Sequence, residues 1–324
     1  MLASGLRFAL QLAAHAERRL SIVTFHRVLP APDPLLPYEP DVAAFETQLA
    51  WLDSAFHILA LPEAVARLAA GTLPPRALCL TFDDGYRNNL ECALPVLRKY
   101  GAPATVFVNT AYLEGGMMWN DQLIEAVRAW PGRTLDLGTH GAGSFELGDD
   151  RASVATRVLD ALKYLSYDER ARLAAGLHRN SGSTVNDLMM SPAEVRRMHD
   201  AGITIGAHTH SHPILARLDA AEAREEIALN QRLLAEICGA PVTCFAYPNG
   251  RPGRDYDERH VAILKDLGFQ AAVTTAPGTA GRGADPLQLP RFTPWDRTES
   301  RYLLRMMQNY FRQPETIGGI SRAA

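Results

Sequence analysis

Two groups of side chains in this 324-residue chain could perform hydrolytic chemistry together. The first is Asp83-Asp84-Gly85, which follows the apolar run 78–82. The second is the segment 208–212, which reads His-Thr-His-Ser-His. One carboxylate and two imidazoles can hold a divalent metal ion and leave a position for water, while the second carboxylate accepts a proton from that water. The pattern therefore indicates a mononuclear metal hydrolase.

The backbone must turn at both groups if their side chains are to meet. Adjacent side chains of a strand point to opposite faces, so Asp83 and Asp84 can share a site only if the strand ends there, and Gly85 permits that turn. In a strand, residues 208 and 212 would lie about 13 Å apart at roughly 3.3 Å per residue. We predict a helical turn that brings positions i and i+4 together. On such a turn the His210 side chain points away from the metal, and we predict a structural role for it. The alternative is that His210 replaces one of the histidine ligands.

The segment Thr81-Phe82-Asp83-Asp84-Gly85 and the histidine segment resemble the first two motifs of the NodB-homology polysaccharide deacetylases, carbohydrate esterase family four. The resemblance extends over about residues 21–297. It implies that Asp84, His208 and His212 hold the metal, and that the fold is α/β, an incomplete, distorted (β/α)7 barrel. It also implies removal of acetyl groups from N-acetylated sugars of a polysaccharide or its biosynthetic precursor.

The resemblance assigns the proton-transfer roles as well. Asp83 takes the role of general base. Many family members supply the general acid from a late Leu-x-His motif, which this chain lacks after His260. His26, in Thr24-Phe25-His26-Arg27, resembles the acid histidine of the members that deacetylate poly-N-acetylglucosamine, and we carry the role to it. The alternative for a lone histidine after a strand is a structural role.

A third motif is altered in this chain. Segment 244–250 reads Cys-Phe-Ala-Tyr-Pro-Asn-Gly and resembles the family motif Phe-Arg-Pro-Pro-Tyr-Gly, with Ala246 and Asn249 replacing the arginine and the tyrosine. The backbone N–H of Asn249 is expected to stabilise the oxyanion, because a main-chain donor survives a change of side chain. Since the motif arginine is missing, Arg291 is the candidate cation that holds Asp83 ionised. Its alternative role is an ordinary surface ion pair.

Three aromatic residues are candidate contacts for the substrate, namely Tyr247 in the third motif, Trp295 and Trp119. The flat apolar face of an indole can pack against the C–H groups of a sugar ring. Either tryptophan could instead belong to the core. The nitrogen ligands favour Zn²⁺ as the metal, and the expected products are acetate and a free amino sugar.

Two other functions fit part of the pattern. An allantoinase-like or cyclic-imide amidohydrolase would use the same scaffold on a small C–N substrate, and a non-catalytic glycan-binding barrel would keep the fold without the chemistry. Trp119, the long insertion and the N-terminal acid favour a sugar over a ureide. The intact carboxylates and histidines disfavour a non-catalytic protein. The sequence leaves open which sugar is used, whether N- or O-linked acetyl is removed, and the oligomeric state.

Short apolar runs alternate with helical patterns along the chain, which predicts parallel strands joined by crossover helices. The carboxyl ends of such strands form the usual place for a site. The predicted strands are 21–25, 77–82, 104–108, 203–206, 243–246, 270–274 and 288–292. The predicted helices are 41–54, 62–70, 89–100, 191–201, 220–237 and 257–267.

Residues 112–190 interrupt this alternation between the two metal-binding motifs. They contain helical patterns at 122–129 and 152–165. We predict a helical insertion within a single catalytic domain spanning residues 1–324, leaning over the site and selecting the substrate. The alternative is a packing elaboration away from the chemistry.

Charge and cysteine content narrow the class of protein. The net charge of −3 indicates no polyanion-binding surface, so nucleic acid is not expected as a partner. Four cysteines without a C-x-x-C pair disfavour a disulfide framework or a thiolate zinc site.

The first residues bear on location. Arg7 interrupts the apolar start and no signal-peptide pattern is recognised, so we expect a cytoplasmic enzyme. One face of this segment carries Leu2, Leu6, Leu10 and Ala13, which would allow peripheral contact with a membrane. No apolar run is long enough to predict a transmembrane segment.

Overall fold

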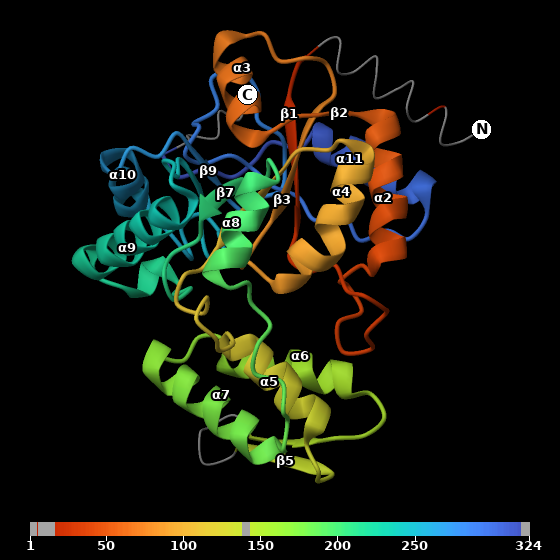
Figure 1. The fold of residues 1–324 in the computed structure, drawn as a ribbon, viewed down its shortest axis with the longest axis vertical. Coiled ribbons are helices and arrows are strands. Elements are labelled where there is room, and N and C mark those ends of the chain that lie inside the picture. Colours follow the sequence, from red (N-terminus) through yellow and green to blue (C-terminus); the bar gives the residue numbers. More distant parts are fainter. Residues whose placement is uncertain (1–4, 6–16, 138–142, 319–324) are drawn as a thin grey trace.

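A curled parallel sheet forms the centre of the computed structural model, which describes residue 5 and residues 17–137 and 143–318 (Figure 1). The strand order is β1-β3-β4-β7-β8-β9, with β2 also paired to β3. These strands are β1 (Leu20–Phe25), β2 (His57–Ile58), β3 (Ala77–Phe82), β4 (Ala104–Val108), β7 (Thr204–Ala207), β8 (Cys244–Ala246) and β9 (Ala271–Val273). This arrangement confirms the predicted incomplete (β/α)7 barrel.

The predicted strand at 288–292 does not form a regular strand. Leu289 makes a bridge to β9 and Phe292 makes a bridge to β1, so the segment still joins the two edges of the sheet. Pro290 lies between them and has no N–H to donate, which interrupts a regular ladder. The short strand β2, which we did not predict, is the seventh strand of the sheet.

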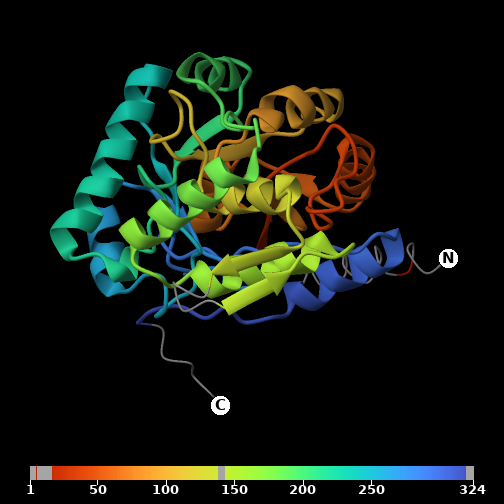
Figure 2. The same cartoon turned by 90° about the horizontal axis from the view of Figure 1, so that it is seen from below.

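Helices surround this sheet close to their predicted positions (Figures 1 and 2). They are α2 (Val42–Ala55), α3 (Leu61–Ala70), α4 (Leu94–Tyr100), α8 (Pro192–Asp200), α9 (Ala220–Cys238) and α10 (Glu258–Asp266). The Asp41 side chain caps α2 by accepting from the Ala44 N–H at 2.7 Å, as predicted. The predicted helix 89–100 instead begins with a π-helical turn before α4. Helix α11 (Glu299–Tyr310), which packs against α2, was not predicted.

Burial on both faces explains the continuous apolar runs of the central strands. Every residue of β1 and β3 is buried, since helices cover one face of the sheet and the barrel interior lies on the other. Thr24 and Thr81 are polar exceptions at corresponding positions of these two paired strands. Their hydroxyl groups contact the site described below.

Residues 112–190, which we call the cap, form a separate layer at one end of the sheet (Figures 1 and 2). The cap contains α5 (Trp119–Ala129), the antiparallel pair β5 (Thr134–Leu137) and β6 (Gly143–Glu146), α6 (Arg151–Leu162) and α7 (Tyr167–Ser181). It has its own hydrophobic cluster, which includes Leu123, Leu135, Val158 and Leu173. We predicted α5 and α6 but neither the strand pair nor α7.

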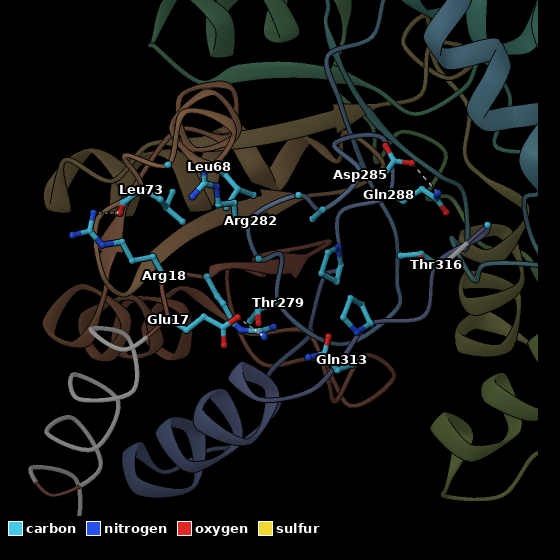
Figure 3. Close-up of a pocket in the computed structure, with 18 of the residues that line it drawn as sticks. Glu17, Arg18, Leu68, Leu73, Thr279, Arg282, Asp285, Gln288, Gln313 and Thr316 are labelled. Carbon is cyan, nitrogen blue, oxygen red and sulfur yellow. Dashed lines mark hydrogen bonds and ion pairs between the residues drawn. The ribbon is translucent and has the colours of Figure 1, made fainter. Parts of the chain in front are cut away.

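A cavity of about 800 Å³ lies away from the cap, beside residues that precede β1 (Figure 3). Its lining includes Glu17, Arg18, Arg282 and Gln288, and none of the predicted site residues. The apolar face expected to contact a membrane falls at residues 2–13, outside the described residues. Across 17–137 and 143–318, no helix combines the length and the apolar character needed to cross a membrane.

Candidate active site

Asp84, His208 and His212 meet at the carboxyl ends of β3 and β7. The Oδ1 atom of Asp84 lies 3.4 Å from Nε2 of His208 and 3.6 Å from Nε2 of His212. One ligand atom from each residue lies within 4.8 Å of the other two. Within the described residues this is the single group of three His, Cys, Asp or Glu side chains that could hold a metal ion. The structure thus brings together the predicted ligand set, which we call the metal triad.

Left-handed backbone conformations produce this convergence. Asp84 has φ 76° and Gly85 has φ 84°, which forms the turn expected after β3. A Cβ atom on Gly85 would lie 2.9 Å from the Val108 side chain, so the close approach of β4 also requires glycine. Non-glycine residues with positive φ are uncommon and store strain that the surrounding structure must hold.

The predicted helical turn at 208–212 is wrong. Thr209 has φ 64° and His212 has φ 58°, whereas a helical turn needs consecutive right-handed residues. The Thr209 hydroxyl accepts a hydrogen bond from the His212 backbone N–H at 3.1 Å and so closes the loop. The two histidines still converge, because the left-handed residues bend the chain as sharply as a helix would.

Hydrogen bonds orient the His208 imidazole. Its Nδ1 lies 2.7 Å from the carbonyl oxygen of Ala246, which assigns the proton to Nδ1 and leaves the Nε2 lone pair facing Asp84. The backbone N–H of His208 donates to Oδ1 of Asn230 at 2.9 Å. We did not predict Asn230, although a polar residue within the apolar stripe of α9 is a signal that could have identified it.

The protonation states of the triad suit a cation. Burial lowers the pKa of His212 to about 4, which keeps its imidazole neutral and able to ligate. For Asp84 burial acts in the opposite direction, but the neighbouring imidazoles of His208, His212 and His26 lower its pKa well below the usual value. An ionised carboxylate and two neutral imidazoles are a donor set that fits a divalent metal ion.

His210 lies outside the metal triad. Its Nδ1 is 2.9 Å from the hydroxyl oxygen of Thr110, and its backbone N–H donates to the carbonyl oxygen of Glu226 at 3.1 Å. These contacts fit the structural role that we predicted for it.

Asp83 forms a buried pair with Arg291. The guanidinium contacts both carboxylate oxygens, at 2.6 and 2.8 Å, and the arginine is only 1% exposed. Arg291 also donates to the hydroxyl of Thr24 at 3.1 Å and to the carbonyl oxygen of Thr274 at 3.0 Å. Burial alone would raise the pKa of Asp83, but Arg291 and His208 lower it overall. The alternative of an ordinary surface ion pair is therefore wrong.

His26 and Asn249 line the same cavity as the metal triad. Burial lowers the pKa of His26, but the negative charges of Asp84, Glu39 and Asp83 outweigh it and raise the pKa overall. Asn249 has φ 58°, and its backbone N–H has no acceptor among the described residues. An unsatisfied main-chain donor at this position is available to a ligand.

This cavity measures about 410 Å³, and the cap forms one of its walls. The barrel contributes Asp83, Asp84, His208, His212 and the residues around Asn249. The cap contributes Met118, Trp119, Asn120, Leu159, Asp160, Lys163 and Arg170. The cap thus lies at the site rather than away from it. We did not predict the polar members of this wall, because charged residues on helices also occur on ordinary solvated faces.

The three predicted aromatic contacts differ in position. Trp119 lines the cavity and packs against Arg170, with 4.6 Å between the guanidinium and the ring centroid. Tyr247 borders the cavity but is fully buried, and its hydroxyl donates to the Leu287 carbonyl oxygen at 3.0 Å. Trp295 is 53% exposed, packs against Arg305 and does not line this cavity. The structure therefore brings Trp119 to the cavity and leaves Trp295 outside it.

Comparisons with solved structures agree with this fold. The deacetylase PplD of Streptococcus pyogenes, solved in complex with acetate, is 20% identical with a TM-score of 0.60, and the match covers 90% of this chain and 99% of that one. IcaB from Ammonifex degensii is 19% identical with a TM-score of 0.55, and the match covers 88% and 97%. At these identities the likeness establishes the shared fold.

Sequence comparisons identify the family. The Bacillus subtilis (strain 168) protein YxkH, named as a polysaccharide deacetylase, is 24% identical over 240 residues, which is 74% of this chain and 59% of YxkH. A poly-beta-1,6-N-acetyl-D-glucosamine N-deacetylase of Staphylococcus aureus (strain MSSA476) is 35% identical over 77 residues, 24% of this chain and 27% of that protein. A family profile described as polysaccharide deacetylase matches residues 70–272, more than half of the chain. The chain therefore belongs to the polysaccharide deacetylase family.

Proposed function

We propose that this protein is a metal-dependent deacetylase that removes acetyl groups from N-acetylated sugars of a polysaccharide or its biosynthetic precursor. One observation carries the proposal: the metal triad and Asp83, which is paired with the buried Arg291, line a single cavity. A cation site beside an ionised carboxylate is the arrangement that hydrolysis by an activated water requires.

The donor atoms of the triad favour Zn²⁺. Two of the three ligand side chains offer imidazole nitrogen, and the hydrogen bond from His208 Nδ1 to Ala246 supports its Nε2 as a ligand atom. A divalent ion held there would supply Lewis acidity that lowers the pKa of a water and polarises the acetyl carbonyl group.

Side chains and one backbone N–H of the protein would perform the remaining steps. Asp83 accepts the proton of the attacking water, and Arg291 keeps its carboxylate ionised and oriented. The Asn249 N–H donates to the oxyanion that develops on the carbonyl oxygen. His26, with its raised pKa, gives a proton to the sugar nitrogen as the C–N bond breaks. The products are acetate and a free amino sugar.

Acetate release tests this function. Purified protein is incubated with N-acetylglucosamine oligosaccharides, with and without a chelator, followed by restoration with zinc. We expect the protein to release acetate, the chelator to abolish this turnover and zinc to restore it. Asp83→Asn should reduce the turnover at least a thousandfold. Hydrolysis of a ureide in place of the sugar, or sugar binding without acetate release, would refute the proposal.

For the cellular location we propose the cytoplasm, where a precursor in exopolysaccharide assembly is an available substrate. Cell fractionation with detection of the protein in the soluble cytoplasmic fraction tests this location. Recovery with the membrane fraction would instead favour the peripheral contact suggested by the apolar face of residues 2–13.

A further inference from the structure

Arg170 of helix α7 is a buried arginine on the cap wall of the catalytic cavity. It is only 4% exposed. Its Nη1 donates to the carbonyl oxygen of Lys163 at 2.8 Å, and its guanidinium packs against the rings of Trp119 and Tyr167. These contacts fix the position of the guanidinium beside the metal triad.

Arg170 has no carboxylate partner. No ion pair joins it to an acidic residue of the described chain, and neither its Nε nor its Nη2 donates a hydrogen bond within those residues. Burial lowers the pKa of Arg170, and the nearby phenol groups of Tyr112 and Tyr167 oppose that shift. The neighbouring aromatic rings stabilise the positive charge in part but leave these donors unsatisfied.

Lys163 adds a second positive charge to the same wall. It lines the cavity, is half-buried and forms no ion pair with any described carboxylate. Burial lowers the pKa of Lys163, and the charges of Arg251 and Arg254 lower it further, whereas Asp255 and Asp160 oppose the shift.

The acidic groups of the cavity do not neutralise these cations. Asp83 is paired with Arg291, and Asp84 belongs to the metal triad. Asp160 is the carboxylate that the cap contributes to the wall; it is exposed, and no ion pair connects it to Arg170 or Lys163 in the described structure. Arg170 and Lys163 therefore face the place where substrate must lie without an ion-pair partner among the described residues.

Burying an uncompensated guanidinium costs several kcal/mol, so retaining one at a cavity wall is explained best by a ligand that completes it. A guanidinium with free N–H groups matches the oxygens of a carboxylate or a phosphate through strong charge-assisted hydrogen bonds. A sugar hydroxyl would satisfy the donors but not the charge.

Arg170 also lines an adjoining cavity of about 330 Å³. Tyr164, Tyr167, Pro213 and Arg217 contribute to its lining. The arginine therefore stands at the junction of the two cavities.

We propose that Arg170, assisted by Lys163, binds an anionic group of the substrate, a carboxylate or a phosphate, while the acetylated sugar beside it occupies the metal triad. This inference rests on the proposed deacetylase function and adds to it that the substrate is acidic. It differs from a role in packing the cap, because it predicts discrimination between charged and neutral substrates.

The test compares substrates that differ in charge. The neutral substrate is an N-acetylglucosamine oligosaccharide, the carboxylate substrate is an oligosaccharide that alternates N-acetylglucosamine with glucuronate, and the phosphate substrate is a nucleoside-diphosphate N-acetylglucosamine. We expect the wild-type protein to prefer one acidic substrate by at least about tenfold in kcat/KM. Arg170→Met should abolish that preference, because kcat/KM should fall at least about tenfold more for the acidic substrate than for the neutral one. Whichever acidic substrate loses its advantage identifies the anion.

A matched control is available on the same helix. Arg172 is exposed and does not line the cavity, so Arg172→Met should retain the preference. Lys163→Met should reduce it in part. An equal loss on neutral and acidic substrates in Arg170→Met, or a wild-type protein without charge preference, would overturn the proposal.

A binding measurement tests the anion site independently of the deacetylase function. Calorimetric titration of the acidic oligosaccharides into wild-type protein and Arg170→Met needs no turnover. If no substrate releases acetate, the proposed function fails, yet tighter binding to the wild type than to the variant still supports the anion site. Equal binding to both proteins refutes it.

Discussion

Asp83 depends mainly on Arg291 for its ionised state. Its carboxylate is buried, and Arg291 contacts both oxygens from within the barrel. The folded pKa of Asp83 is depressed, so the stability that the pair contributes is present above the unfolded pKa of about 3.9 and is lost as pH falls through the folded value. The same pair sets the pH range in which Asp83 can act as a base.

Arg291→Met should therefore affect both stability and the pH profile. The unpaired buried carboxylate should lower the free energy of unfolding by about 3–5 kcal/mol near neutral pH. Burial would then raise the pKa of Asp83, so the acid limb of the kcat/KM profile should move to higher pH. Arg291→Lys, which keeps the charge but not both contacts, should give a smaller shift. An unchanged acid limb in a folded Arg291→Met protein would exclude the proposed role.

Metal content distinguishes the ligands from their histidine neighbour. We expect Asp84→Ala or His212→Ala to abolish stoichiometric metal binding and to reduce acetate release at least a thousandfold. His210→Ala should retain the metal, because its imidazole contacts Thr110 instead. Elemental analysis of the purified variants measures this directly. Full metal occupancy in His212→Ala would disprove the assignment.

The sequence predicts the members of the triad because residue type and motif are local properties. It does not predict how the loop of residues 208–212 bends, since left-handed Thr209 and His212 depend on the packing around them. Arg170 was missed for a similar reason. Its position on α7 resembles that of an exposed helical charge, and it is buried where α7 packs on α5 and Trp119 covers its guanidinium.

Among the structural elements, the contact between cap and barrel depends on a small buried network. The hydroxyl of Tyr86, after β3, lies 3.1 Å from both carboxylate oxygens of Asp121 in α5. Arg27, after β1, packs over the Tyr86 ring and lies 3.8 Å from Asp121. Burial raises the pKa of Asp121 to about 7, although Arg27 opposes the shift.

This network predicts a pH dependence of stability. A carboxyl with a raised folded pKa contributes stability below its unfolded pKa, and that contribution is lost as pH rises through about 7. Wild-type protein should therefore lose about 2–3 kcal/mol relative to Asp121→Asn between pH 5 and pH 8. Urea unfolding of both proteins at the two pH values measures the difference. Glu114→Gln, at an exposed carboxyl of the cap, is the control and should follow the wild type.

The strands and helices of the barrel were predictable because their hydrophobic patterns are strong. Capping residues also mark the starts of some helices. The side chains of Asp41 and Ser191 cap the first turns of α2 and α8. The segment 288–292 was harder, since Pro290 breaks the ladder without removing the apolar pattern. The strand pair of the cap and α7 were missed because their short or weakly apolar patterns gain stability mainly from the cap's own core.

For the whole molecule, ligand binding should increase resistance to unfolding. A metal that binds the folded triad and not the unfolded chain stabilises by about 2.7 kcal/mol at one hundred times its dissociation constant. We expect zinc at that level to raise the Tm of the apoprotein by about 4 °C. Asp84→Ala should show no such increase. Equal shifts in both proteins would place the zinc elsewhere.

The independent hydrophobic cluster of the cap has an evolutionary consequence. Because the metal triad rests on barrel strands while Trp119, Lys163 and Arg170 come from the cap, substitutions can accumulate on one part without repacking the other. Chemistry and substrate choice can therefore diverge separately in this architecture. We predict that transplanting residues 112–190 onto another barrel of this family changes which glycan the recipient enzyme accepts.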